Sequence, residues 1–175
     1  MRIANTIQDS IVDGPGLRFT VFTQGCPHKC PGCHNPETHD FTGGVEVTVE
    51  ELAERMDSNP ATRGLTLSGG DPFMQAAECA RLAAIAHEQG RDVWAYTGFV
   101  YERLLEEGDP DRLALLEQVD VLVDGPFVEK LKSYAALFRG STNQRLIDMN
   151  ETRRQGKIVL WERRDPLAHF TVPEN

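Results

Sequence analysis

The chain has 175 residues, 40% of them hydrophobic and 26% charged, which excludes a mainly disordered chain and fits a single domain spanning residues 1–175. Its net charge of −9 argues against nucleic acid as a partner, because phosphate binding needs clustered positive charge. No apolar run reaches the roughly 18 residues that span a membrane, and no secretory signal opens the chain, so we expect a cytoplasmic protein without a membrane partner.

Strand-like and helix-like segments alternate along the chain. Strands are predicted at residues 17–22, 64–67, 92–96 and 119–123. Helices are predicted at residues 49–57, at residues 73–88 and after Asp109-Pro110. The C-terminal extension, which begins near residue 150, is predicted to form a β-hairpin from strands at 145–149 and 158–161, with its turn at Gln155-Gly156.

This alternation predicts parallel βαβ units with right-handed crossovers. The unusual residues directly follow the strands, and the carboxyl ends of parallel strands meet at one edge, so these loops should converge on one rim. The chain is short for a complete eight-stranded barrel, which takes about 250 residues. We therefore predict an α/β fold in the form of a partial, incomplete parallel β/α barrel or a strongly curved open sheet.

Three of the four cysteines lie in one short loop, at Cys26, Cys30 and Cys33. Thiols stay reduced in the cytoplasm, so clustered cysteines indicate a metal or cluster site. Three thiolates can hold one side of an iron–sulfur cube and leave one iron open to a substrate. Cys79 stands apart, on the apolar stripe of the predicted 73–88 helix, and should be a buried core residue.

A tetrahedral zinc site is the alternative, with His28 or His34 as the fourth ligand, and the cysteines alone do not decide between zinc and a cluster. Apart from that alternative, the histidines are scattered along the chain. We expect His28, His39, His87 and His169 to be surface or capping residues. The chain has neither a nucleophile elbow nor a phosphate-binding loop of the Gly-x₄-Gly-Lys type.

The Cys-x₃-Cys-x₂-Cys motif resembles that of the radical S-adenosylmethionine enzymes. The flanking residues 12–18 and 33–38 are similar to those of the glycyl-radical activating enzymes in that superfamily. The resemblance covers residues 1 to about 150. It is strongest to members that activate anaerobic ribonucleoside-triphosphate reductase, and it is carried there by residues 67–72, 94–98, 121–125 and 139–144.

The resemblance implies a partial barrel of the radical S-adenosylmethionine type with a [4Fe–4S] cluster. Cys26, Cys30 and Cys33 would each bind one iron, and the fourth iron would chelate the amino and carboxylate groups of S-adenosyl-L-methionine. The adenine would then be contacted by His34 and by backbone near Gly32 and Cys33.

The rest of the implied cofactor site comes from the loops after the later strands. Gly69 and Gly70 would present backbone to the methionine end, with Asp71 near its amino group. Tyr96, Thr97 and Asp124 would line the same rim. We expect Gly70→Val to keep the cluster and lose S-adenosylmethionine, because a side chain would obstruct the approach of the backbone to the ligand.

The implied function is that of an activase, an oxidoreductase that reductively cleaves S-adenosylmethionine and abstracts a glycine α-hydrogen on anaerobic ribonucleoside-triphosphate reductase. A small electron-transfer protein, flavodoxin or ferredoxin, would supply the electron. One alternative is the activase of pyruvate formate-lyase, which shares residues 13–16 but is usually longer. Another is a non-catalytic module that holds zinc through three cysteines and a histidine.

Overall fold

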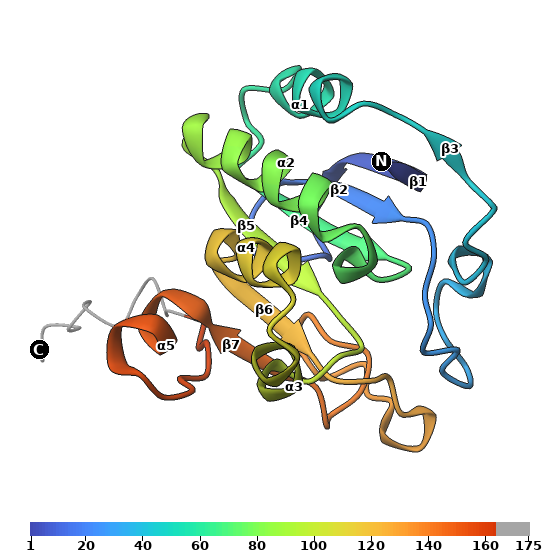
Figure 1. The fold of residues 1–175 in the computed structure, drawn as a ribbon, viewed down its shortest axis with the longest axis vertical. Coiled ribbons are helices and arrows are strands. Elements are labelled where there is room, and N and C mark those ends of the chain that lie inside the picture. Colours follow the sequence, from blue (N-terminus) through green and yellow to red (C-terminus); the bar gives the residue numbers. More distant parts are fainter. Residues whose placement is uncertain (164–175) are drawn as a thin grey trace, which may run out of the picture.

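The computed structural model describes residues 1–163. Within them one sheet of seven strands runs in the order β3-β1-β2-β4-β5-β6-β7 (Figure 1). The strands are β1 Arg2–Ser10, β2 Arg18–Thr23, β3 Val45–Glu46, β4 Gly64–Gly69, β5 Asp92–Tyr96, β6 Val121–Asp124 and β7 Arg145–Asp148. Strands β2, β4, β5 and β6 pair in parallel, as predicted, whereas β1 joins β2 and β7 joins β6 in antiparallel pairs.

The sheet is open, because β3 and β7 form its two edges and do not pair with each other in the described chain. The helices are α1 Val49–Asp57, α2 Ala76–Glu88, α3 Tyr101–Glu107, α4 Pro110–Gln118 and α5 Met149–Gln155. Helices α1, α2 and α4 lie side by side on one face of the sheet (Figure 1). The fold is therefore mixed α/β. No helix of residues 1–163 has the length and apolar character needed to cross a membrane.

Two of the predicted helix starts are confirmed by their caps. The Thr48 hydroxyl accepts the Glu51 amide at 3.1 Å, and the Glu51 carboxylate accepts the Thr48 amide at 2.9 Å, which is a complete capping box. Asp109 caps α4 by accepting the Arg112 amide at 2.9 Å. The predicted 73–88 helix is α-helical from Ala76 onward, after a 3₁₀ turn that begins at Pro72.

The predicted C-terminal hairpin is confirmed in its first strand, which is β7, but wrong in its turn, because helix α5 follows β7. Asp148 starts this helix by accepting the Glu151 amide at 2.9 Å, and Gly156 ends it with φ +66°. The predicted strand at 158–161 is reduced to one bridge, between Leu160 and Ile147. His169 lies outside the described residues.

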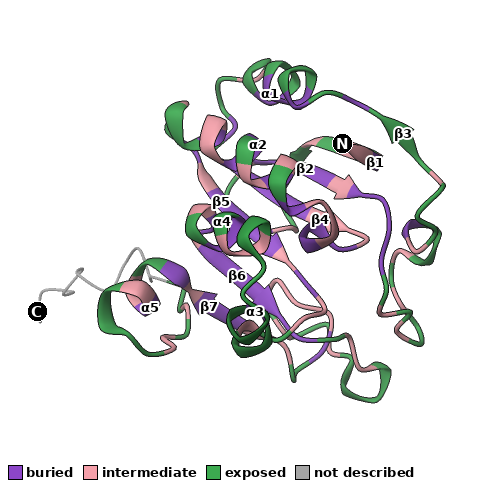
Figure 2. Cartoon of the chain, viewed as in Figure 1, coloured by how far each residue is buried: buried purple, intermediate pink, exposed green. Residues whose placement is uncertain are grey.

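The two faces of the sheet differ in chemistry because successive side chains of a strand point to opposite faces. The face toward α2 is apolar and includes Phe19, Val21, Leu65, Leu67, Val93 and Ala95, all of them buried. The ribbons of β4, β5 and β6 are coloured as buried along most of their length (Figure 2). Cys79 is 0% exposed in this core, as expected. The other face carries polar residues of the same strands together with a small cluster around Trp94.

Arg18 is the largest charged side chain on this second face, and it is fully buried. Its guanidinium donates to the Thr66 hydroxyl at 2.7 Å, to the Leu65 carbonyl at 2.8 Å and to the Asp92 carboxylate at 2.9 Å. It also lies over the ring of Trp94, 5.6 Å from the ring centroid. Burial lowers the pKa of Arg18 and Asp92 opposes this change. The side chain thus ties β2 to β4 and β5.

We predict that Arg18→Lys lowers the free energy of unfolding by about 2–4 kcal/mol, because an ammonium group cannot reach the partners on both β4 and β5 and leaves buried acceptors unpaired. Urea unfolding followed by circular dichroism measures this change. Arg81→Lys is the matched control, since the Arg81–Glu50 pair is 63% exposed on both sides and its loss should alter stability by about 0.5 kcal/mol or less. Equal effects of the two variants would contradict the role of Arg18.

Candidate functional site

The loops that follow β2, β4, β5 and β6 enclose one cavity of about 660 Å³. This arrangement agrees with the convergence of loops that the parallel strands predict. The predicted site residues that line the cavity are Cys26, Cys30, Cys33, His34, Gly69, Gly70, Tyr96 and Thr97. Three other residues, Gly32, Asp71 and Asp124, are not part of its lining.

The cysteine loop leaves β2 and is anchored at its start by residues 37–40. The Gly25 amide donates to the Thr38 carbonyl at 2.8 Å, and the Cys26 amide donates to the His39 carbonyl at 3.3 Å. The Gln24 side chain donates to the carbonyls of Glu37 and Asp40. These bonds fix the position of Cys26 relative to the end of the strand.

The three thiols are free and differ in exposure. Cys26 is buried, whereas Cys30 and Cys33 are half-buried. Burial raises the pKa of Cys26, and hydrogen bonds from the backbone amides of His28 and Lys29 act in the opposite direction. The Asn35 amide donates to the Cys33 sulfur at 3.4 Å. Amides directed at sulfur favour the thiolate form, which is the form that binds metal.

These features fit an iron–sulfur cluster. All three thiols come from one loop that lines a cavity, and the Asn35 amide supplies Cys33 with a hydrogen bond of the kind that tunes such clusters. In residues 1–163 no three or more His, Cys, Asp or Glu side chains, the loop cysteines included, are grouped to hold a single metal ion. A [4Fe–4S] cluster takes each thiolate on a different iron, so it does not require the thiols to converge on one ion.

Gly69 and Gly70 lie where β4 meets the cysteine loop. Gly69 has φ +93°, and a Cβ on it would lie 2.5 Å from the Thr23 nitrogen. A Cβ on Gly70 would lie 2.4 Å from the Gly25 carbonyl oxygen. This contact argues against the expectation that Gly70→Val leaves the cluster site intact, since any side chain at Gly70 displaces the residue before Cys26.

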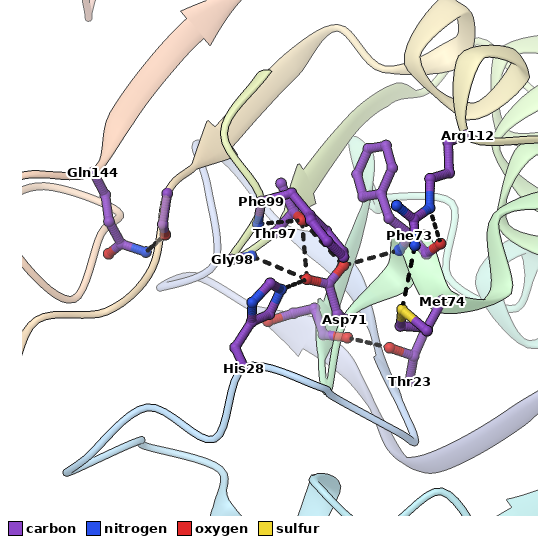
Figure 3. A network of polar contacts seen from close by, with 12 residues as sticks. Thr23, His28, Asp71, Phe73, Met74, Thr97, Gly98, Phe99, Arg112 and Gln144 are labelled. Carbon is purple, nitrogen blue, oxygen red and sulfur yellow. Dashed lines mark hydrogen bonds and ion pairs between the residues drawn. The ribbon is translucent and has the colours of Figure 1, made fainter. Parts of the chain in front are cut away.

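The Asp71 carboxylate is fully buried and is bonded to protein groups (Figure 3). It lies 2.8 Å from Nε2 of His28 and accepts the Thr97 hydroxyl at 2.9 Å. It also accepts the amides of Gly98 and Phe73, both at 3.0 Å. Asp71 thus joins the loops after β2, β4 and β5 beneath the cavity, and its carboxylate is not part of the cavity wall.

Tyr96 and Thr97 do line the cavity, yet their hydroxyl groups have protein partners. The Tyr96 hydroxyl donates to the Phe138 carbonyl at 2.9 Å, and the Thr97 hydroxyl is bonded to Asp71. Burial raises the pKa of Tyr96, so this phenol is a neutral donor. Its bond attaches the long loop at 126–144 to the end of β5.

Asp124 is buried in an ion pair outside the cavity. Its carboxylate accepts Nε of Arg145 at 2.9 Å and the Tyr101 amide at 2.8 Å. Arg145 also pairs with Glu102, and the bonds with Asp124 and Glu102 raise the pKa of Arg145. These bonds connect β6, β7 and the start of α3. Asp124 therefore stabilises the contact between these elements and does not line the cavity.

Residues 139–144 fold the 126–144 loop against the cavity. The side-chain Oε1 of Gln144 accepts the Gly140 amide at 2.9 Å, and its side-chain Nε2 donates to the Gly125 carbonyl at 3.0 Å. Phe127 packs against the ring of His34 with centroids 5.0 Å apart. The loop therefore places an aromatic pair beside Cys33.

Two residues of the site were missed by sequence reasoning. His28 was expected to be a surface or capping residue, and the structure places it on the cavity wall in contact with Asp71. Its position between two cysteine ligands is the signal that could have identified it. Asp13 also lines the cavity and accepts the Ser10 hydroxyl at 2.6 Å.

Comparison with known families first gives the class of protein. A family model described as a 4Fe-4S single cluster domain matches residues 12–147, a segment that contains all three loop cysteines. The class indicated by the cysteine loop and its cavity is therefore that of proteins with one 4Fe-4S cluster.

Curated relatives give the particular family. The anaerobic ribonucleoside-triphosphate reductase-activating protein of Salmonella typhimurium (strain LT2) is 37% identical over 142 residues, which cover 77% of this chain and 90% of the relative. The proteins of that name from Escherichia coli (strain K12) and Enterobacteria phage T4 are 35% and 39% identical, with 90% and 86% of their lengths covered. The chain belongs to the family of anaerobic ribonucleoside-triphosphate reductase-activating proteins. The resemblance seen in the sequence is confirmed, and neither alternative is favoured.

We predict that Cys26→Ala, Cys30→Ala or Cys33→Ala abolishes a stable cluster, whereas Cys79→Ala retains it. Cys79 is fully buried in the apolar core, and burial raises its pKa, so its thiol is not a metal ligand. Iron and sulfide analysis after anaerobic reconstitution should give about four irons per chain in the wild type. Stoichiometric zinc without iron, or loss of the cluster in Cys79→Ala, would contradict the assignment.

We predict that Gly70→Ala lowers both the melting temperature and the iron content, because its Cβ displaces Gly25 and with it the cysteine loop. Gly156→Ala is the control, since Gly156 is also a constrained glycine, with φ +66°, but has open space around its Cβ position and lies at the end of α5. The control should destabilise by about 1 kcal/mol and keep full iron content. Full iron content in Gly70→Ala would show that the contact with Gly25 is unimportant.

Proposed function

We propose that the chain is a radical S-adenosylmethionine activase that generates the glycyl radical of an anaerobic ribonucleoside-triphosphate reductase. One observation carries the proposal: three free thiols line a cavity together with Gly69, Gly70 and Thr97 from the ends of parallel strands. Membership of a family whose relatives bear the name of this activity supports it.

In this proposal the bound cofactors supply the radical. S-adenosylmethionine, held beside a cluster on Cys26, Cys30 and Cys33 and reduced by one electron, would supply the group that takes a hydrogen atom from a glycine α-carbon of the reductase, with methionine as the leaving group. The products are 5′-deoxyadenosine and a glycyl radical. The electron comes from a flavodoxin or ferredoxin in the cytoplasm.

The protein's own residues bind and orient these groups. Cys26, Cys30 and Cys33 each bind one iron of the cluster. Gly69 and Gly70 line the cavity beside the start of the cysteine loop, and their lack of side chains leaves backbone as the surface offered to the methionine end of S-adenosylmethionine. Thr97 lies on the same wall, where Asp71 fixes the orientation of its hydroxyl.

The adenine has a suitable surface on the opposite side. The rings of His34 and Phe127 lie 5.0 Å apart on the cavity wall, next to the Gly32–Cys33 backbone. Aromatic faces of this kind favour stacking of a purine. The Tyr96 hydroxyl holds the 126–144 loop in place by donating to the Phe138 carbonyl.

The open sheet suits a macromolecular substrate. We propose that its parallel strands form the partial barrel of the radical S-adenosylmethionine type, and that one domain is sufficient because the substrate belongs to another protein. An open side would admit a glycine-bearing loop of the reductase to the cavity. Water exclusion would then depend on the two proteins together.

The test is electron paramagnetic resonance without oxygen, on this protein, dithionite, S-adenosylmethionine and an anaerobic ribonucleoside-triphosphate reductase. We expect a glycyl doublet on the reductase, which is lost when its radical glycine is changed to alanine or when Cys30→Ala is used. Cleavage to 5′-deoxyadenosine without a reductase signal would point to another glycyl-radical partner. Absence of both products would overturn the proposal.

A further inference from the structure

Exposed apolar side chains gather at the border of the cavity. Eleven large apolar side chains are exposed in residues 1–163. Six of them come from two segments, 7–12 and 126–144, and both segments line the cavity. These six are Ile7, Ile11, Val12, Leu131, Tyr134 and Leu137. Single exposed apolar residues are ordinary, whereas a group of them in one place indicates an interaction surface.

Tyr134 is the most exposed of these side chains, at 94%. The ammonium group of Lys132 lies over its ring, 5.1 Å from the centroid. The attraction between a cation and an aromatic face keeps the two side chains together. Tyrosine is enriched among the residues that contribute most to protein–protein binding, because it buries a large area at a low cost in conformational entropy. Tyr134 therefore has the properties of an anchor residue.

The part of the 126–144 loop that carries Tyr134 has a fixed base. The Thr142 amide donates to the Leu131 carbonyl at 2.9 Å, which joins the two arms of the loop. Phe138 has φ +56°, a left-handed conformation that strains a residue other than glycine, and its ring packs against Trp94 with centroids 5.4 Å apart. Such strain persists only where surrounding contacts hold it. The base thus presents residues 134–137, which project beyond the sheet (Figure 1).

The same loop carries cations without acidic partners. Lys132 and Arg139 line the cavity, and neither forms an ion pair within residues 1–163. Arg139 donates to the Gln144 carbonyl at 2.8 Å, whereas its Nε is buried and has no hydrogen-bond partner in the described chain. Among the described residues of the lining, Asp13 is the one with a carboxylate, and this accepts the Ser10 hydroxyl at 2.6 Å. In a chain of net charge −9, a positive cavity border favours an acidic partner.

The proposed chemistry determines what covers this border. A hydrogen atom is taken from a glycine α-carbon only when that carbon reaches the reacting group inside the cavity, because the reacting atoms must be in near contact. The protein that carries the glycine then has to lie on the segments beside the cavity, which are 7–12 and 126–144. These are the segments where the exposed apolar side chains and the unpaired cations gather.

We propose that these segments form a docking surface for the reductase, here called the rim surface, made of Ile11, Val12, Tyr134 and Leu137 with Lys132 and Arg139. Tyr134 is its anchor. The surface fits a face of the reductase that is apolar around Tyr134 and acidic opposite Lys132. The inference rests on the proposed function and adds to it the residues that select the partner. Tyr134 and Lys132 act in binding the reductase and not in the cleavage of S-adenosylmethionine.

The first test measures the affinity of full-length, cluster-loaded protein for an anaerobic ribonucleoside-triphosphate reductase by biolayer interferometry without oxygen. We expect Tyr134→Ser to weaken binding about tenfold or more, because truncation of an anchor residue has an effect of this size. Leu105→Ser is the matched control, since Leu105 is 48% exposed on α3 and does not line the cavity. Both side chains are exposed, so both variants should keep the wild-type melting temperature.

The second test measures the association rate at low and high ionic strength. Lys132→Glu should lower the rate several-fold at low salt and weaken its dependence on salt, because opposite charges steer association only while salt does not screen them. Lys157→Glu is the matched control, since it makes the same change of charge at an exposed position outside the cavity lining. Identical rates and salt dependence in the two variants would overturn the acidic character of the partner.

A third measurement separates docking from catalysis. In Tyr134→Ser, cleavage of S-adenosylmethionine by dithionite without reductase should stay at the wild-type level. The yield of glycyl radical should fall with the affinity when the reductase is held below its dissociation constant. Loss of cleavage in the absence of the reductase would place Tyr134 in the cofactor site and overturn its assignment to docking.

The remaining outcomes distinguish this inference from the proposed function. Unchanged affinity and radical yield in both Tyr134→Ser and Lys132→Glu would overturn the rim surface and leave the proposed function standing. A wild type that binds the reductase through Tyr134 but forms no glycyl radical would overturn the proposed function and leave the rim surface standing. If sedimentation shows a dimer of this chain that Tyr134→Ser dissociates, while reductase binding is unchanged, a second copy covers the surface and the inference is overturned.

Discussion

The parallel pairing of β2 with β4 is the constraint on which the site depends. It runs in unbroken register from Arg18 opposite Gly64 to Thr23 opposite Gly69. It then continues past both strands, because the Gly70 amide donates to the Thr23 carbonyl at 2.7 Å and the Asp71 amide donates to the Gly25 carbonyl at 2.9 Å. The cysteine loop and the glycine loop are thus joined before any side chain takes part. Close approach of two backbones requires residues without side chains, which explains glycine at these positions more directly than contact with a ligand does.

Sequence reasoning succeeded where a local signal determined the structure. The capping box at Thr48 and Glu51 placed α1, and the short apolar runs placed the four parallel strands, since both patterns act within a few residues. The convergence of the special loops on one cavity followed from the direction of parallel strands. The cysteine ligands were evident because their spacing carries the chemistry. These parts of the fold and site depend little on distant contacts.

The parts of the fold and site that sequence reasoning did not predict depend on contacts between distant segments, or on a helix-cap signal that was overlooked. Asp71 and Asp124 both follow strands and both seemed to belong to the rim, yet each is bonded by residues more than 20 positions away, His28 and Thr97 in one case and Arg145 in the other. A sequence shows the carboxylate but not the donors that fold onto it. Helix α5 is a different case, because Asp148 followed three residues later by Glu151 is a helix-start signal that the hairpin interpretation passed over.

The two faces of the sheet have different roles: one forms the apolar core, and the other carries buried polar and charged side chains. Alternate residues of β2 send Phe19 and Val21 into the apolar core under α2, while Arg18 and Thr20 point to the opposite face. On that face the buried charges are neutralised by fixed partners, as Arg18 is by Asp92 and as Asp71 is bonded by His28 and Thr97. Buried charges that are paired and hydrogen-bonded hold the loops without exposing a carboxylate to the cavity wall around Gly69 and Thr97. The three thiols of the cysteine loop are free and line the same cavity, so their chemistry is decided by what they bind.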